Sequence, residues 1–261
     1  MKTRKMKVTT KIFLIIYIAI IVGDLLLGIT IATKVKKSFV DQIMSDSVHM
    51  AACAGMAVNG ESLASVNEGD EDSDAYNDVL DAINIYRENG GIEYIYTVRK
   101  LSDGSYIYLV DADPDEPAAI GDEFTESDGL IAAFEGTPSA DSESMVDEWG
   151  EHLSSYAPVY SGDKIVGAVG IDMSMNWINE QLNGIILMII IVCGIILLLS
   201  LVILIAVTGY LRKNFNVLND KVLNLTDGNG DLTKEIELNH GDEFETIADS
   251  INRFIREIRS L

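Results

Sequence analysis

Residues 92–111, IEYIYTVRKLSDGSYIYLVD, decide the fold of this chain. They have a period of two on both sides of the turn sequence Leu101-Ser102-Asp103-Gly104. A period of two is typical of a strand with one buried face, and a short Gly-containing turn between two such runs is typical of a β-hairpin. We therefore predict strands over residues 92–99 and 105–111.

The sequence on both sides of this hairpin predicts an α+β domain. Apolar residues at helical spacing predict one helix that ends near Ala57 and a second that runs from Tyr76 to about Gly91. Residues 59–74 are rich in Gly and Asp, which is typical of a loop. Helices followed by a run of strands indicate one antiparallel sheet. The elements predicted after the hairpin are a short helix over Asp128–Phe134 and strands over residues 152–159 and 164–172.

Two long apolar runs flank this domain. Residues 12–33 contain Asp24 as their one ionisable side chain, and residues 184–207 contain none. At about 1.5 Å per residue in a helix, each run exceeds the roughly 30 Å of a bilayer core. The first run is also longer than the apolar part of a signal peptide and lacks a small-residue cleavage site. The sequence thus predicts a multi-pass cell-membrane protein with two transmembrane α-helices, at residues 12–33 and 184–208.

The distribution of charge predicts the orientation of the chain. Residues 1–11 carry five basic side chains, and Arg212 and Lys213 follow the second apolar run. Basic residues that flank a span mark its cytoplasmic side, so we place both termini in the cytoplasm and residues 34–183 outside the cell. That outer segment has 30 acidic and 7 basic residues. The net charge of −22 for the whole chain excludes a nucleic-acid partner, because the phosphates would be repelled.

The outer segment resembles a known family of sensor domains. Residues 92–124, IEYIYTVRKLSDGSYIYLVDADPDEPAAIGDEF, and residues 156–174, YAPVYSGDKIVGAVGIDMS, are similar to the extracellular single Cache (PAS-like) domain of bacterial sensory receptors. The resemblance covers residues 36–183 and implies a pocket over the sheet for a small ligand of the amino-acid or carboxylate type. Alternatively, the tyrosines are strand formers that only pack the sheet. The pocket candidates that the resemblance implies are Tyr94, Tyr96, Arg99, Tyr106, Tyr108, Asp111, Tyr156 and Asp172.

Two acidic features leave alternatives open. Asp24 is either a packing residue that faces another helix or a polar contact across a dimer that biases signalling. The series Asp111-x-Asp113-x-Asp115 begins like a calcium loop but lacks the Gly and the Glu that such a loop needs at its sixth and twelfth positions. It is either a cation site or, as we expect, a loop at the rim of the pocket.

The cytoplasmic end, residues 209–261, resembles a HAMP domain. Apolar residues that alternate in steps of three and four form two coiled-coil seams, separated by residues 227–241. This connector is long enough to return along the first helix, so the second helix runs parallel to it. Gly230-Asp231-Leu232-Thr233 in the connector and Asp242-Glu243 after it match the family. The chain departs from the family in having Glu245 where a Gly is usual, and in lacking a proline after the second span.

HAMP units work as parallel four-helix dimers, so this resemblance implies a homodimer. The seams and the start of the second helix supply the candidates for relaying a signal. These are Phe215, Leu218, Val222, Leu225, Asp242, Glu243, Phe244, Ile247, Ile251, Phe254 and Ile258.

Span, Cache domain, span and HAMP domain together resemble the N-terminal part of a bacterial methyl-accepting chemotaxis receptor. The alternatives are the sensor part of a histidine kinase or diguanylate cyclase, and a ligand-binding membrane protein without an output. The last helix carries no cap before Leu261, so we expect the natural chain to continue into an output domain. The three histidines are scattered and no Gly-rich phosphate loop opens a helix, so we expect no catalytic site, metal site or cofactor.

The predicted orientation is testable with the two cysteines, Cys53 and Cys193. One lies in the outer segment and the other inside an apolar run, so they cannot pair with each other. A membrane-impermeant thiol reagent added to intact cells should label the chain at Cys53, and Cys53→Ser should abolish the label. Labelling that requires cell lysis would show that the orientation is reversed.

Overall fold

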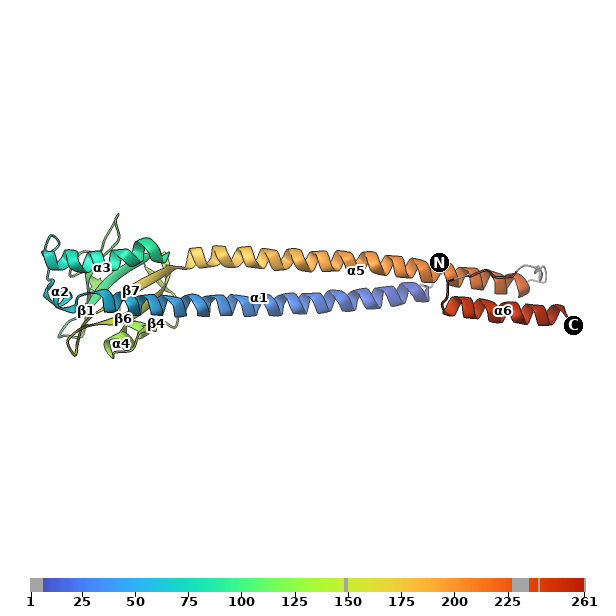
Figure 1. Cartoon of the computed structure of the whole chain (residues 1–261), viewed down its shortest axis with the longest axis horizontal. Helices are drawn as coiled ribbons and strands as arrows, with labels where there is room; N and C mark the ends of the chain where they lie inside the picture. The colour runs from blue at the N-terminus through green and yellow to red at the C-terminus, as the bar shows by residue number, and fades with distance from the viewer. Residues whose placement is uncertain (1–6, 148–149, 227–234, 239, 261) are drawn as a thin grey trace, which may run out of the picture. The chain divides into compact units, whose positions relative to one another are not determined.

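The computed structural model describes residues 7–147, 150–226, 235–238 and 240–260. It divides into two compact units. Residues Ile31–Met188 form the first, which we call the sheet unit, and Met1–Thr30 together with Ile189–Leu261 form the second, which we call the helical unit. Two long helices, α1 (Val8–Ala57) and α5 (Met175–Thr226), contribute to both units (Figure 1).

The sheet unit is built on one antiparallel sheet of seven strands. The order is β3-β2-β1-β7-β6-β4, and β5 pairs with β6. The predicted α+β fold with a single antiparallel sheet is therefore confirmed, including the hairpin β1–β2 and the pair β6–β7. The strands are β1 (Tyr94–Lys100), β2 (Tyr106–Asp111), β3 (Glu123–Phe124), β4 (Ser139–Ala140), β5 (Met145–Asp147), β6 (Gly150–Ser161) and β7 (Lys164–Ser174).

The two faces of the sheet are covered differently. On one face, the end of α1, the first turns of α5 and the helices α2 (Gly60–Ser65) and α3 (Asp74–Gly90) bury an aliphatic core with strand residues such as Ile95 and Ile171. The opposite face carries a smaller, mainly aromatic cluster, against which the short helix α4 (Asp128–Phe134) packs. Removing this apolar surface from water stabilises the unit. The aromatic face is the one left partly open.

A β-bulge in β2 reverses the direction of the side chains at the end of that strand. Val98 pairs with Tyr108 and Tyr96 pairs with Asp111, so two residues of β2, Leu109 and Val110, lie opposite the single residue Thr97. The hydroxyl of Thr97 accepts a hydrogen bond from the backbone N–H of Val110 at 3.0 Å and lies 3.3 Å from its carbonyl oxygen. Without the extra residue, Asp111 would point to the opposite face of the sheet.

One predicted loop contains a helix. Residues 59–74 were expected to be irregular, but Gly60–Ser65 form α2. The side chain of Asn59 caps this helix by accepting hydrogen bonds from the backbone N–H groups of Glu61 and Ser62 at 3.0 and 3.4 Å. Leu63 in its middle is fully buried under the sheet. The prediction was wrong here because one buried leucine anchors a segment whose composition is otherwise typical of a loop.

Helices α1 and α5 are each long and apolar enough to cross a membrane. Their most apolar windows have mean hydropathies of 2.8 and 3.5 and are 6% and 0% buried inside the molecule. Large side chains such as Leu26 and Leu198 are therefore exposed along them. Asp24 is an exception, because only 7% of it is exposed and it is covered by the chain itself.

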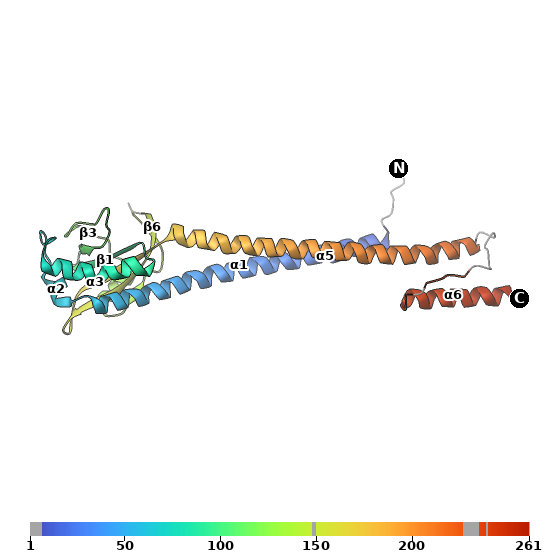
Figure 2. The same ribbon diagram turned by 45° about the horizontal axis from the view of Figure 1, so that its top comes forward.

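In the helical unit, α6 (Glu243–Arg259) runs parallel to the last part of α5 (Figures 1 and 2). The hydroxyl of Tyr210 on α5 donates to the carboxylate of Asp242, which precedes α6. The rings of Phe215 and Phe244 lie edge to face, with their centroids 5.1 Å apart. The start of α6 therefore lies beside residues well before the end of α5, as a parallel arrangement requires.

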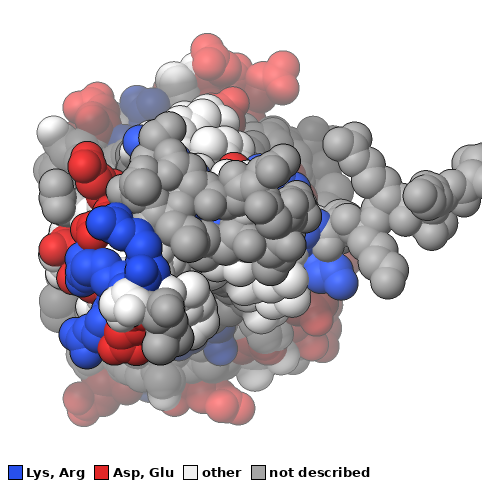
Figure 3. All heavy atoms as spheres, turned by 90° about the vertical axis from the view of Figure 1, so that its right-hand side faces the viewer, with Lys and Arg blue, Asp and Glu red and all other residues white. Residues whose placement is uncertain are grey.

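Two side chains cap the start of α6, those of Asp242 and Glu245. The side chain of Asp242 accepts hydrogen bonds from the backbone N–H groups of Phe244 and Glu245. The carboxylate of Glu245 accepts one from the backbone N–H of Gly241 at 2.7 Å. This resembles a capping box, so the glutamate that departs from the HAMP pattern stabilises the beginning of the helix. The last turn of α6 carries Arg256 and Arg259. Seen from this end, the described surface shows basic side chains next to acidic ones (Figure 3).

The relay candidates divide into buried and exposed residues. Leu218 and Phe244 are buried together with Ala248 and with two connector residues, Ile236 and Leu238. Ile251 packs against this cluster, whereas Asp242 and Glu243 begin α6. The side chain of Leu225, the Gly230-Asp231-Leu232-Thr233 motif and Leu261 lie outside the described residues. The exposed candidates are Phe215, Val222, Ile247, Phe254 and Ile258.

The bulge predicts that Thr97→Val destabilises the sheet unit although the two side chains have nearly the same shape. Valine leaves the buried N–H of Val110 without its acceptor, which costs about 1–3 kcal/mol. Urea unfolding of Ile31–Met188, followed by tryptophan fluorescence, measures this loss. Thr97→Ser keeps the hydroxyl and should lose clearly less, so equal losses for both variants would contradict the role of the hydrogen bond.

Candidate ligand-binding site

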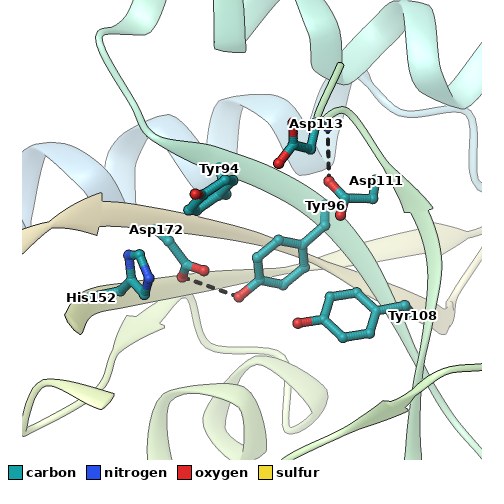
Figure 4. A pocket seen from close by; sticks show the side chains of 7 residues that line it. All are labelled: Tyr94, Tyr96, Tyr108, Asp111, Asp113, His152 and Asp172. Atoms are coloured by element: carbon teal, nitrogen blue, oxygen red, sulfur yellow. Dashed lines mark hydrogen bonds between the residues drawn. The ribbon is translucent and has the colours of Figure 1, made fainter. Parts of the chain in front are cut away.

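The partly open face of the sheet contains two adjoining hollows. The smaller, of about 20 Å³, is lined by Tyr94, Tyr96, Tyr108, Asp111, Asp113, His152 and Asp172 (Figure 4). The larger, of about 500 Å³, shares four of these residues and extends along Asp122–Thr125, Met145, Ser154 and Tyr156. The larger volume is typical of a site for a small molecule, whereas the smaller one is close to that of a single water molecule.

Strand register explains why these side chains converge. Tyr94 pairs with Asp172 across β1 and β7, and Asp172 pairs with Ser154 across β7 and β6. Because side chains alternate along a strand, the even-numbered residues of these three strands share the open face. Tyr108 reaches the same face from β2, and the bulge brings Asp111 back to it.

Tyr96 and Asp172 form the floor of the site. The hydroxyl of Tyr96 donates to a carboxylate oxygen of Asp172 at 3.1 Å. Burial raises the pKa of Tyr96 well above its ordinary value, and the nearby carboxylate of Asp172 raises it further. Burial likewise raises the pKa of Tyr156. Both phenols therefore remain neutral hydrogen-bond donors at physiological pH.

Asp111 and Asp113 lie at the rim and organise the loop that follows β2. Asp111 accepts hydrogen bonds from the backbone N–H groups of Asp113 and Ala118, at 3.0 and 2.9 Å, and Asp113 accepts one from Asp115 at 2.9 Å. This matches the expected rim loop. Among the described residues, no group of three or more His, Cys, Asp or Glu side chains is arranged to hold a metal ion.

The lining of the site is acidic and aromatic. The two hollows together are lined by the carboxylates of Asp111, Asp113, Asp122, Glu123 and Asp172. No lysine or arginine is among the described residues that line them, and His152 is the one lining residue able to carry a positive charge. Carboxylates and the faces of tyrosine rings both attract cations, so the lining favours a positively charged group over an anion.

The structure brings together most, but not all, of the predicted pocket residues. Tyr94, Tyr96, Tyr108, Asp111, Tyr156 and Asp172 line the hollows. Tyr106 does not, because its ring is buried against Phe134, with centroids 5.4 Å apart. Arg99 lies on the opposite face, where its guanidinium donates to the carbonyl oxygens of Leu63 and Val66 at 2.6 and 2.9 Å. Arg99 is therefore not the pocket residue that was predicted, because odd-numbered residues of β1 point away from the cavity.

Sequence reasoning missed His152. This side chain is 3% exposed, its ring meets that of Tyr94 edge to face with centroids 5.4 Å apart, and its Nδ1 lies 3.6 Å from a carboxylate oxygen of Glu93. The signal was present in the sequence, because His152 shares its parity with Tyr156 in the predicted strand over residues 152–159.

No protein-family model matches this sequence. No curated protein matches it either. Solved structures that are similar to the chain include sensor domains. The ligand-binding domain of the Campylobacter jejuni chemoreceptor Tlp3, in complex with L-valine, is 16% identical with a TM-score of 0.44, over 62% of this chain and 64% of that chain.

The sensor domains of the V. cholerae histidine kinase DctB and of E. coli DcuS are also similar. The V. cholerae DctB sensor domain is 12% identical with a TM-score of 0.49, over 60% of this chain and 58% of that chain. The E. coli DcuS sensor domain is 14% identical with a TM-score of 0.37, over 57% of this chain and 97% of that chain. This chain thus spans roughly three fifths of the length of the Tlp3 and DctB domains. We assign no residue role from these likenesses.

The surroundings of Asp111 predict a pH-dependent effect of Asp111→Asn on stability. Burial raises the pKa of this carboxyl, and the hydrogen bonds from Ala118 and Asp113 offset only part of the rise. The folded state therefore holds the proton more tightly than the unfolded state, in which the pKa is about 3.9. The wild type should lose stability relative to the variant as pH rises from about 3.9 through the raised value. Urea unfolding of both proteins across this range tests it, and a pH-independent difference would contradict it.

Proposed function

We propose that this chain is the sensory part of a transmembrane receptor that detects a small extracellular molecule carrying an ammonium group. The observation that supports this is the cavity of about 500 Å³, lined by tyrosines and carboxylates and, among the described residues, by no lysine or arginine. The Cache resemblance implies ligands of the amino-acid or carboxylate type. Of these two, the lining favours the amino acid or a related amine, because a dicarboxylate would meet like charges.

The ammonium group would bind between Asp111 and Asp172, in the smaller hollow. Both carboxylates line this hollow, together with the rings of Tyr94 and Tyr108. An ammonium group there donates charge-assisted hydrogen bonds to the carboxylates and makes cation–π contacts with the rings. The rest of the ligand would occupy the larger hollow toward Tyr156.

We place α1 and α5 across the membrane. The rest of the described chain leaves their long apolar surfaces uncovered. The hydrocarbon core of a bilayer would cover these surfaces. In this arrangement the cavity is extracellular, and both termini are cytoplasmic as the basic flanks indicate. The helical unit then lies at the membrane and in the cytoplasm.

A HAMP-like relay would carry the signal onward in a homodimer. α6 is parallel to α5, and five relay candidates at coiled-coil positions expose apolar side chains, among them Phe254 at 59% and Phe215 at 53%. A second copy would cover them in a parallel four-helix bundle. The change at the ligand site would bias that bundle between two packings.

We propose chemotaxis as the process. The sensor part of a histidine kinase or diguanylate cyclase is the alternative, because the same front half serves those enzymes. A ligand-binding membrane protein without output is the third possibility. The coding sequence downstream of Leu261 distinguishes the three, by a long helical hairpin, by a kinase or cyclase domain, or by a stop codon.

The function is tested by ligand binding to the full chain in lipid nanodiscs. We expect a rise in the melting temperature with one or more amino acids or primary amines at millimolar concentration, and none with dicarboxylates. Asp172→Asn should weaken binding roughly 10- to 150-fold, because a hydrogen bond to a charged group contributes about 1.5–3 kcal/mol. Asp163→Asn, in the exposed turn between β6 and β7, is the matched control. Stabilisation by dicarboxylates alone would overturn the ammonium assignment.

A further inference from the structure

Gly170 lies in β7 beneath the Tyr96 ring that forms part of the cavity floor. It pairs with Tyr96 of β1 on one side and with Tyr156 of β6 on the other. Its position in β7, two residues before Asp172, puts it on the same open face of the sheet. A glycine thus separates two buried tyrosines at the centre of a sheet, where a side chain would normally pack.

The absent side chain is replaced by the ring of Tyr96. A Cβ atom built on Gly170 would lie 2.3, 2.7 and 3.0 Å from three ring carbons of Tyr96, Cε2, Cζ and Cδ2. These are the three atoms nearest to it, so its crowding is with a side chain rather than with the backbone. The direct cross-strand partner of Asp172 is Tyr94, so Tyr96 reaches Asp172 diagonally, over Gly170.

A methyl group at this position would move the ring toward the cavity. Carbon atoms pack at about 3.5–4.0 Å, so the Tyr96 ring would have to shift by about 1 Å or more. The rings of Tyr108 and Phe124 already lie against it, with centroids 5.2 and 5.5 Å away. The open space that borders Tyr96 is the cavity itself, so a shifted ring would fill part of it and lose its hydrogen bond to Asp172.

We propose that Gly170 is a specificity-determining position. Because it has no side chain, the Tyr96 ring can lie across β7, and the larger hollow stays open for the part of the ligand beyond its ammonium group. The inference rests on the proposed function, because it concerns the size of the ligand that this cavity accepts. Gly170 acts through Tyr96 and does not contact the ligand.

Ligand size provides the first test. Affinities of the full chain in nanodiscs are measured for primary alkylammonium ions from methyl to hexyl. Gly170→Ala should lower the ratio of hexylammonium to methylammonium affinity by roughly tenfold or more, because a cavity discriminates strongly against added methylenes that it cannot hold. In a Tyr96→Val background the same substitution should change the ratio by less than about threefold, because the ring is gone. Gly184→Ala, at a glycine with no atom near its Cβ position, is the matched control.

A ligand-free measurement separates this inference from the proposed function. The ¹⁹F resonance of Tyr96 in protein labelled with 3-fluorotyrosine, assigned with Tyr96→Phe, should move in Gly170→Ala and stay in Gly184→Ala. If the wild type binds none of the ions, the proposed ammonium function is wrong. If the Tyr96 resonance does not move in Gly170→Ala, the proposed role of Gly170 is wrong, whether or not the ions bind. An unchanged affinity ratio, or an equal change in the Tyr96→Val background, would overturn it while the proposed function stands.

Discussion

The cavity and the helix that leaves the sheet unit both depend on strand β7. It lies inside the sheet and is hydrogen-bonded on both sides, by β1 and by β6, so its position is fixed by two ladders. Its open face carries Gly170 and Asp172, whereas Val169 and Ile171 point into the aliphatic core. The strand ends at Ser174 and α5 begins at Met175, with no loop between them. Ile178 and Leu182 of that helix are buried in the same core, which fixes the first turns of α5 against the sheet.

Much of the fold was predictable because apolar residues follow the helical spacing in the helices and a period of two in the long strands. The change from helical spacing to a period of two located the hairpin, and glycines marked the turns and the end of α3, where Gly91 has φ of +64°. Strand parity assigned the tyrosines to one face, and the same rule would have excluded Arg99 and included His152. The short strands β3, β4 and β5 were missed, because two or three residues are too few to show a period.

The position of Asp111 could not be derived from the sequence in the same way. Parity along β2 would have placed it with Leu109 on the helical face, and the β-bulge opposite Thr97 is what returns it to the cavity. No residue in β2 indicates a bulge, because the hydroxyl that stabilises the bulge belongs to Thr97 of the neighbouring strand β1. The cap at Glu245 is a similar case, because its effect depends on a contact with Gly241 that a family pattern does not contain.

The bonds of Arg99 also bear on how the unit responds to force. By holding the carbonyl oxygens of Leu63 and Val66, this side chain fastens the segment that follows α1 to strand β1. The other long helix, α5, is the direct continuation of β7, and β1 and β7 are neighbours. The two helices are thus anchored to adjacent strands, and the cavity takes Tyr94 and Tyr96 from one strand and Asp172 from the other. Under the proposed function, a ligand bound between these two strands would act on the one ladder that joins the anchors of α1 and α5, and a small shear along that ladder would shift the sheet-unit ends of the two helices relative to each other.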